Sequence, residues 1–220
     1  MALIFDTGSE TLNQRLRALT PSVHAACEGA DSAHDLAHVE RVTRNAQRLS
    51  RATGARTEIS VTAALLHELF NYPKGHPDSR NSGHVCAQHA SALLTQHAWD
   101  QETITQVHYA IAVHPFSLGV VPTTLEAQVL QDADRLDAIG AIGIARCFAT
   151  CAAMGRPFYD PDDPWSEHRA LDDKLWGVDH FALKLDKLAG SMHTEAAREM
   201  AHAKSAFMSE FLAQMRAEVG

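Results

Sequence analysis

The chain has 220 residues, of which 45% are hydrophobic, and a formal net charge of −8. This length and apolar content predict one domain over residues 1–220, with about 190–220 as a C-terminal helical arm packed on it. An acidic chain without a block of Lys or Arg is a poor candidate for binding a nucleic-acid polymer, because phosphate neutralisation dominates that binding. Free nucleotides are not excluded, since a bound cation and one or two basic side chains are enough for them.

The residues from Met1 to Asp6 contain neither a basic segment nor a long apolar stretch, and no run reaches the length of a membrane span. We therefore expect a cytoplasmic protein without a membrane partner. The cysteines lack a Cys-x-x-Cys spacing, and Cys147 and Cys151 lie four apart in an apolar stretch. This pattern predicts reduced core thiols rather than a disulfide or a zinc site.

Apolar residues recur at helical spacing along most of the chain, and no strand-like alternation is sustained. The predicted helices run from 31 or 32 to about 49, 57–70, 82 to about 98, 100 to about 113, 124 to about 154, about 176–188 and 194–219. The low polarity of the stretch from 124 indicates a central helix, in which Gly140 and Gly143 would allow close packing. The Pro-rich segment 156–165 is predicted to be a functional cover or a disordered excursion. The sequence thus indicates an all-α, bundle-like fold.

Several histidines and carboxylates each stand at the end of an apolar run: His38, the pair His67 and Glu68, and Asp134. Neutral imidazoles and carboxylates are the side chains that hold divalent cations of intermediate hardness. Asp134 also lies within one crowded turn, with Asp132 and Asp137, of an otherwise apolar stretch. Because unpaired buried carboxylates are costly, a cation would account for that crowding. A metal site between helices is the expected result.

The segments 35–42, 64–68, 74–80 and 131–143 resemble a small, single-domain bacterial branch of the HD-domain superfamily of metal-dependent phosphohydrolases. The similarity runs from about His24 to about Ala201. It implies an HD-domain-like helical bundle with metal ligands at His38, His67, residue 68 and Asp134. Residue 68 departs from the pattern, because this sequence has Glu where the family has Asp.

Glu68 carries one methylene more than Asp, which moves its carboxylate by about 1.5 Å. Three outcomes are open: Glu68 binds the ion through a shifted rotamer, water replaces it while it supports the site from outside, or the site is weakened. We favour retained coordination, because the remaining motif residues are intact.

Two further residues are candidates for the chemistry itself. His34 stands four residues before His38, which predicts that both lie on one helical face. His34 would orient substrate or donate a proton, and the alternative is a solvated residue in the first turn. Asp137, one turn after Asp134, is the candidate for orienting a water or a ligand histidine.

The residues Lys74, His76 and Arg80 form a short basic patch after the His67 motif, as a polyphosphate substrate would require. The alternative is an exposed charged loop. His114, before Pro115, is a candidate substrate contact; a second-metal ligand and a cation at a helix C-terminus are the alternatives.

We expect one divalent ion, Mn²⁺ by preference and Mg²⁺, Fe²⁺, Co²⁺ or Zn²⁺ as alternatives, to activate a water that attacks a nucleotide or a related phosphate ester. The resemblance implies release of phosphate or pyrophosphate, and the spacing does not choose between them. Two other functions fit the same residues: an HD-type hydrolase or lyase acting on a non-phosphate small molecule, and a metal- or ligand-binding module that has lost turnover. The sequence does not predict the oligomeric state.

Overall fold

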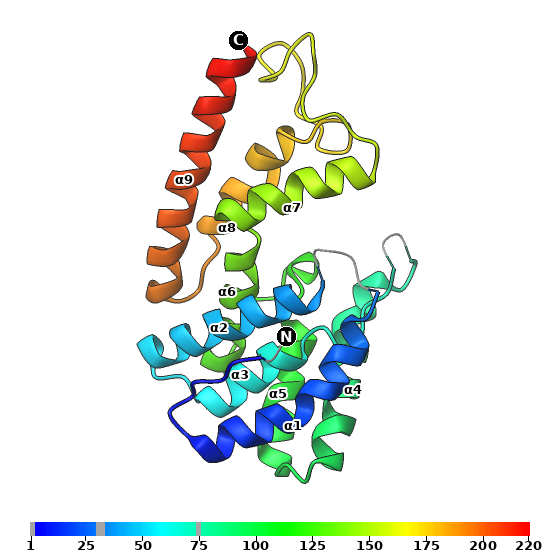
Figure 1. The fold of residues 1–220 in the computed structure, drawn as a ribbon, viewed down its shortest axis with the longest axis vertical. Coiled ribbons are helices and arrows are strands. Elements are labelled where there is room, and N and C mark those ends of the chain that lie inside the picture. The colour runs from blue at the N-terminus through cyan, green and yellow to red at the C-terminus, as the bar shows by residue number, and fades with distance from the viewer. Residues whose placement is uncertain (1–2, 30–33, 74–75) are drawn as a thin grey trace. The chain divides into compact units, whose positions relative to one another are not determined.

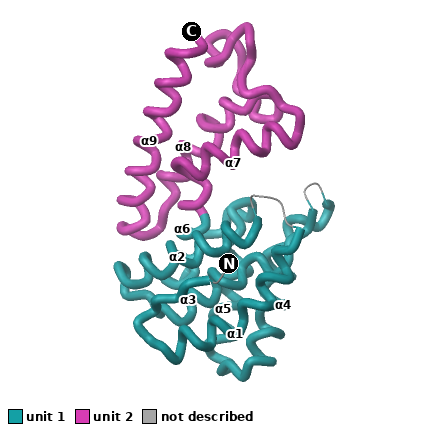
Figure 2. The backbone as a smooth tube through the Cα atoms, in the orientation of Figure 1, with its two compact units in different colours: residues 1–134 teal, residues 135–220 magenta. Residues whose placement is uncertain are grey.

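The computed structural model describes residues 3–29, 34–73 and 76–220, and within these ranges the regular elements are all helical. The predicted all-α fold is therefore confirmed. The chain forms two compact units, residues 1–134 and 135–220 (Figures 1 and 2), and each is described here by itself. The proposal of a single domain with residues 190–220 as an arm stays a prediction.

Unit 1 is built around a short helix that is buried on every side. Its helices are α1 (Glu10–Cys27), α2 (Leu36–Thr53), α3 (Thr57–Leu66), α4 (Ser82–Gln96), α5 (Gln101–Val113) and most of α6 (Leu125–Asp137). In α3, every residue from 59 to 66 is buried, and the helix packs against α1, α2 and α5. Because neighbours enclose α3 all round, the position of its C-terminal end is fixed by packing.

The first turn of α2 is set by an aspartate. The Asp35 carboxylate accepts a hydrogen bond from the backbone N–H of His38 (2.8 Å), as an N-cap residue does. The predicted caps, Asp31 and Ser32, lie outside the described residues. His34 consequently stands before the cap, so the expectation that it shares a helical face with His38 is wrong.

Helix α1 was not expected from the sequence, although its signals are present. Ser9 caps it by accepting a hydrogen bond from the Leu12 N–H (3.3 Å). Its buried apolar residues follow helical spacing: Leu12, Leu16, Leu19, Val23 and Cys27. Pro21 lies inside the helix, where proline normally counts against one. Packing of this apolar stripe therefore outweighs the unfavourable local preference.

Unit 2 begins with the end of α6 and contains α7 (Gly140–Ala153), a π-helical turn (Phe181–Leu185), α8 (Asp186–Ala189) and α9 (Glu195–Val219). Both α7 and α8 pack on α9. The expected continuous helix from 124 to about 154 is wrong, because the chain breaks between α6 and α7. Gly140 has φ +75°, and a Cβ on Gly143 would lie 2.2 Å from the Ala138 carbonyl oxygen. Both glycines are thus required by the break.

The segment 156–175 is folded back within unit 2. The Asp163 carboxylate accepts backbone N–H groups from Glu167, His168 and Arg169. Arg169 then forms a two-pronged ion pair with the buried Asp179, at 2.6 and 2.9 Å. These bonds are charge-assisted and bidentate, so the predicted disordered excursion is wrong for this segment.

All four cysteines are buried and unbridged, which confirms the expected core thiols. Burial raises the pKa of Cys27 to about 11 and that of Cys86 to about 12. Within the described part of the chain, no single helix is long and apolar enough to cross a membrane. Among the described helices, the consecutive pair α6 and α7 reaches that length and composition when taken together.

Candidate metal centre

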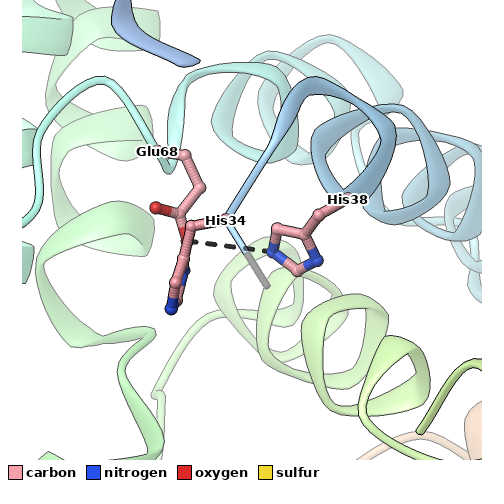
Figure 3. Close-up of side chains that lie close together, drawn as sticks. All are labelled: His34, His38 and Glu68. Carbon is pink, nitrogen blue, oxygen red and sulfur yellow. Dashed lines mark hydrogen bonds and ion pairs between the residues drawn. The ribbon is translucent and has the colours of Figure 1, made fainter. Parts of the chain in front are cut away.

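Three helix ends of unit 1 bring imidazoles and carboxylates together. His38 lies in the first turn of α2, His67 and Glu68 directly follow α3, and Asp134 lies near the end of α6. His34, just before α2, lies close to His38 and Glu68 (Figure 3). The ligand atoms of His38, His67 and Asp134 all lie within 4.8 Å of one another, and so do those of His34, His38 and Glu68.

The distances between these atoms suit a shared cation. Nε2 of His38 lies 3.1 Å from Nε2 of His67 and 3.6 Å from an Asp134 carboxylate oxygen. Oε1 of Glu68 is 3.8 Å from each of the two Nε2 atoms. Adjacent ligand atoms of an octahedral ion, each at about 2.1 Å, are about 3 Å apart. The atoms of His38, His67 and Asp134 therefore fit one divalent ion with small adjustments of the side chains, and the Glu68 carboxylate lies next to both histidines of this group.

His67 is held in the protonation state that a ligand needs. Its Nδ1–H donates to the Ala64 carbonyl oxygen (2.6 Å), which leaves the lone pair on Nε2. Burial is the main reason why the pKa of His67 falls to about 4, and the neighbouring His38 and His114 lower it further. The charges of Glu68 and Asp134 act in the opposite direction. At neutral pH the imidazole is thus neutral, as metal binding requires.

Glu68 is an ionised carboxylate in a buried place. Burial by itself would raise its pKa, but a hydrogen bond from His34 and the nearby His67 and His38 lower it to about 2. His34 provides this bond through Nδ1, 2.9 Å from Oε1 of Glu68. Since an ionised carboxylate only accepts, Nδ1 of His34 carries the proton.

His114 lies beside the cluster, at the C-terminal end of α5. Its Nδ1–H donates to the Ile111 carbonyl oxygen (2.6 Å), and its ring stands edge-on to that of His67 with centroids 5.4 Å apart. The side chain is buried. The three roles considered for His114 stay predictions.

Two amides that the sequence did not single out hold α6 against its neighbours. Nδ2 of Asn45, on α2, donates to the Ala133 carbonyl oxygen (3.3 Å). Nε2 of Gln131 donates to the carbonyl oxygens of Val113 (2.8 Å) and Val120 (3.0 Å). These bonds fix the turn that carries Asp134. A buried polar residue in an apolar helix was the available signal for Gln131.

The other predicted site residues have different surroundings. Lys74 lies outside the described residues. His76 stacks on Tyr72 (ring centroids 4.5 Å apart) and accepts the Asp78 N–H through Nδ1 (3.1 Å), while Arg80 is exposed in a 3-10 turn. Asp137 is buried in unit 2, where its carboxylate pairs with Arg146 (2.9 Å). The roles predicted for these residues stay predictions.

The model of the HD domain family matches residues 35–139, a range that includes all four predicted metal ligands. The protein YpgQ of Bacillus subtilis (strain 168) is 32% identical over 192 residues, which cover 86% of this chain and 85% of YpgQ. The chain belongs to the HD superfamily. The resemblance inferred from the four motifs is thereby confirmed.

Solved structures agree with this assignment over nearly the whole HD protein. The structure of B. subtilis YpgQ in complex with ADP has a TM-score of 0.75 and 30% identity, covering 94% of this chain and 96% of that one. An HD-superfamily hydrolase from Bacillus thuringiensis has a TM-score of 0.74 and 31% identity, covering 94% and 97%. The relatives of this chain thus include HD-superfamily hydrolases. Its own cluster of histidines and carboxylates suits the divalent metal of an HD domain.

Proposed function

We propose that this HD protein is a metal-dependent phosphohydrolase that releases phosphate or pyrophosphate from nucleotides or related phosphate esters. The observation that carries the proposal is the grouping of His38, His67 and Asp134, whose ligand atoms lie within 4.8 Å of one another. Oε1 of Glu68 lies 3.8 Å from Nε2 of both histidines. The ADP found in the YpgQ structure supports a nucleotide as the substrate class.

The side chains of the cluster differ in their solvent exposure, which indicates where a substrate would enter. The side chains of His38, His67 and Glu68 are nearly enclosed, whereas that of Asp134 is 28% exposed and that of His34 is 34% exposed. The cluster is therefore closed on the α3 side and open beside Asp134 and His34. A phosphate group would approach from the open side.

A divalent ion at this centre, Mn²⁺ by preference, would neutralise a phosphate oxygen and lower the pKa of a bound water. The residues themselves supply imidazole nitrogens at His38 and His67 and carboxylate oxygens at Glu68 and Asp134. His34, which is 34% exposed and has Nδ1 turned to Glu68, is proposed to contact the substrate. Lys74, His76 and Arg80 are proposed to balance the remaining phosphate charge.

A phosphate-release panel tests the proposal. The protein, purified without chelator, would be incubated with Mn²⁺ and with nucleoside mono-, di- and triphosphates, and both phosphate and pyrophosphate would be measured. We expect release from at least one nucleotide, its loss with EDTA and its return with Mn²⁺. Asp134→Asn should lower the rate by at least about 100-fold, because a metal ligand acts with the rest of the centre as one unit. His202→Ala, an exposed position on α9, serves as the matched control.

The panel also separates the two rival functions. Bound metal without phosphate release from any nucleotide would contradict the proposal and favour a hydrolase or lyase acting on a non-phosphate molecule. A protein that binds no divalent ion would contradict it too, and would favour a binding module.

A further inference from the structure

The Glu68 carboxylate has a partner outside the proposed set of four ligands. Nδ1 of His34 donates to Oε1 of Glu68 over 2.9 Å. The same oxygen lies 3.8 Å from Nε2 of His38 and 3.8 Å from Nε2 of His67. One hydrogen bond thus holds the oxygen beside both ligand nitrogens.

A glutamate at this position needs such a restraint more than an aspartate would. It has one more rotatable bond, so its carboxylate can occupy more positions and loses more conformational entropy when it is fixed. A charge-assisted hydrogen bond of this length is among the stronger ones in proteins and restricts that freedom. An aspartate at residue 68 would withdraw the carboxylate by about 1.5 Å, away from His34.

The start of α2 explains why His34 can reach Glu68. Asp35 caps the helix by accepting the His38 N–H, so helical geometry begins only at Leu36. His34 lies before this boundary, and its ring centroid is 6.0 Å from that of His38, at an interplanar angle of 75°. The chain therefore places one imidazole among the metal ligands and the other against the Glu68 carboxylate.

We propose that His34 is a positioning residue for Glu68, and that its Nδ1–H holds the longer carboxylate at the metal centre in compensation for Glu standing where the family has Asp. The inference rests on the proposed metal centre. It assigns His34 a role through Glu68, beyond any contact of its own with substrate.

A double-mutant cycle on metal affinity tests this role without using activity. Mn²⁺ would be titrated calorimetrically into chelator-treated wild type, His34→Ala, Glu68→Asp and the double variant. We expect His34→Ala to weaken binding by about 10- to 100-fold, as loss of a partner that orients a ligand does. In the Glu68→Asp background, the same substitution should change affinity by less than about twofold, because the bond is already absent.

A conservative variant distinguishes the hydrogen bond from general disruption. The side-chain amide of Asn can place an N–H near the position of Nδ1, so His34→Asn should restore most of the affinity that His34→Ala loses. His202→Ala should bind as wild type does, and thermal unfolding of each metal-free variant checks the fold.

The outcomes separate the positioning role from the metal centre itself. Unchanged affinity in His34→Ala, equal losses in the wild-type and Glu68→Asp backgrounds, or an Asn variant as weak as the Ala variant would each overturn the positioning role. Wild type that fails to bind Mn²⁺ would overturn the metal centre and, with it, this inference.

Discussion

Two histidines of this protein end helices in the same way. His67 after α3 and His114 after α5 each donate Nδ1–H to the carbonyl oxygen three residues earlier, both at 2.6 Å. The carbonyls at a helix C-terminus lack partners within the helix, so an imidazole there satisfies one of them. In His67, whose pKa is about 4, this bond leaves the lone pair on Nε2, 3.1 Å from Nε2 of His38.

The buried His67 should make the metal-free protein sensitive to mild acid. Its pKa is about 4 in the folded state, against an ordinary value of 6.5. Between these values the unfolded chain binds more protons, so the free energy of unfolding decreases as the pH falls from 6.5 toward 4. We expect His67 to account for a loss of roughly 2 to 3 kcal/mol between pH 7 and pH 4.5.

Urea unfolding of EDTA-treated protein at the two pH values measures this loss. His67→Asn removes the titrating group and can keep a donor for the Ala64 carbonyl. Between pH 7 and pH 4.5, the free energy of unfolding of this variant should therefore decrease by roughly 2 to 3 kcal/mol less than that of wild type. Glu68 titrates at lower pH, where its folded-state pKa is about 2. Equal pH dependence in wild type and the variant would show that His67 does not titrate as described.

The position of one helix follows from its composition, whereas the boundary of another depends on the backbone conformation of a single residue. Helix α3 is apolar on nearly every face, and its burial follows directly from that composition. The boundary between α6 and α7 is instead determined by Gly140, whose φ of +75° is a conformation that other residues adopt only with strain. The helix propensities of residues 124–154 indicate only a mild penalty at the glycines. Propensity does not include the sign of φ, so it does not predict that the helix ends here.

Gly140→Ala should therefore destabilise the protein. A Cβ in this left-handed conformation costs about 1–2 kcal/mol, and it would also approach Cγ of Lys204 to 3.0 Å. Gly190→Ala is the matched control, because Gly190 has φ −75° and an added Cβ would come no closer than 3.7 Å to another residue. We expect the control to lie within about 0.5 kcal/mol of wild type in urea unfolding. Equal stability of the two variants would show that the break does not depend on Gly140.

At the scale of the whole molecule, the sequence predicted the fold class, and it singled out residues that the structure brings together as a candidate site. The all-α class followed from the spacing of apolar residues, and the HD family followed from four short motifs. Helix α1 was missed because Pro21 counts against a helix locally, while the packing that outweighs it is not local. The break at Gly140 was missed for a similar reason.

The candidate site also has a part that the sequence could predict and a part that it could not. His38, His67, Glu68 and Asp134 could be predicted because their residue types and motifs specify metal chemistry. The hydrogen bond between His34 and Glu68 could not be predicted, because it depends on where Asp35 caps α2 and on how far the extra methylene of Glu68 extends the carboxylate. Both are three-dimensional quantities that the spacing of residues does not contain.

The central claim is that one divalent ion binds among His38, His67, Glu68 and Asp134. Anomalous diffraction from crystals of the Mn²⁺-loaded protein tests it most directly. The account predicts one strong manganese peak per chain, within about 2.0–2.4 Å of both Nε2 atoms and of a carboxylate oxygen of Asp134 and of Glu68. A peak elsewhere in the chain, or none at saturating Mn²⁺, would contradict it.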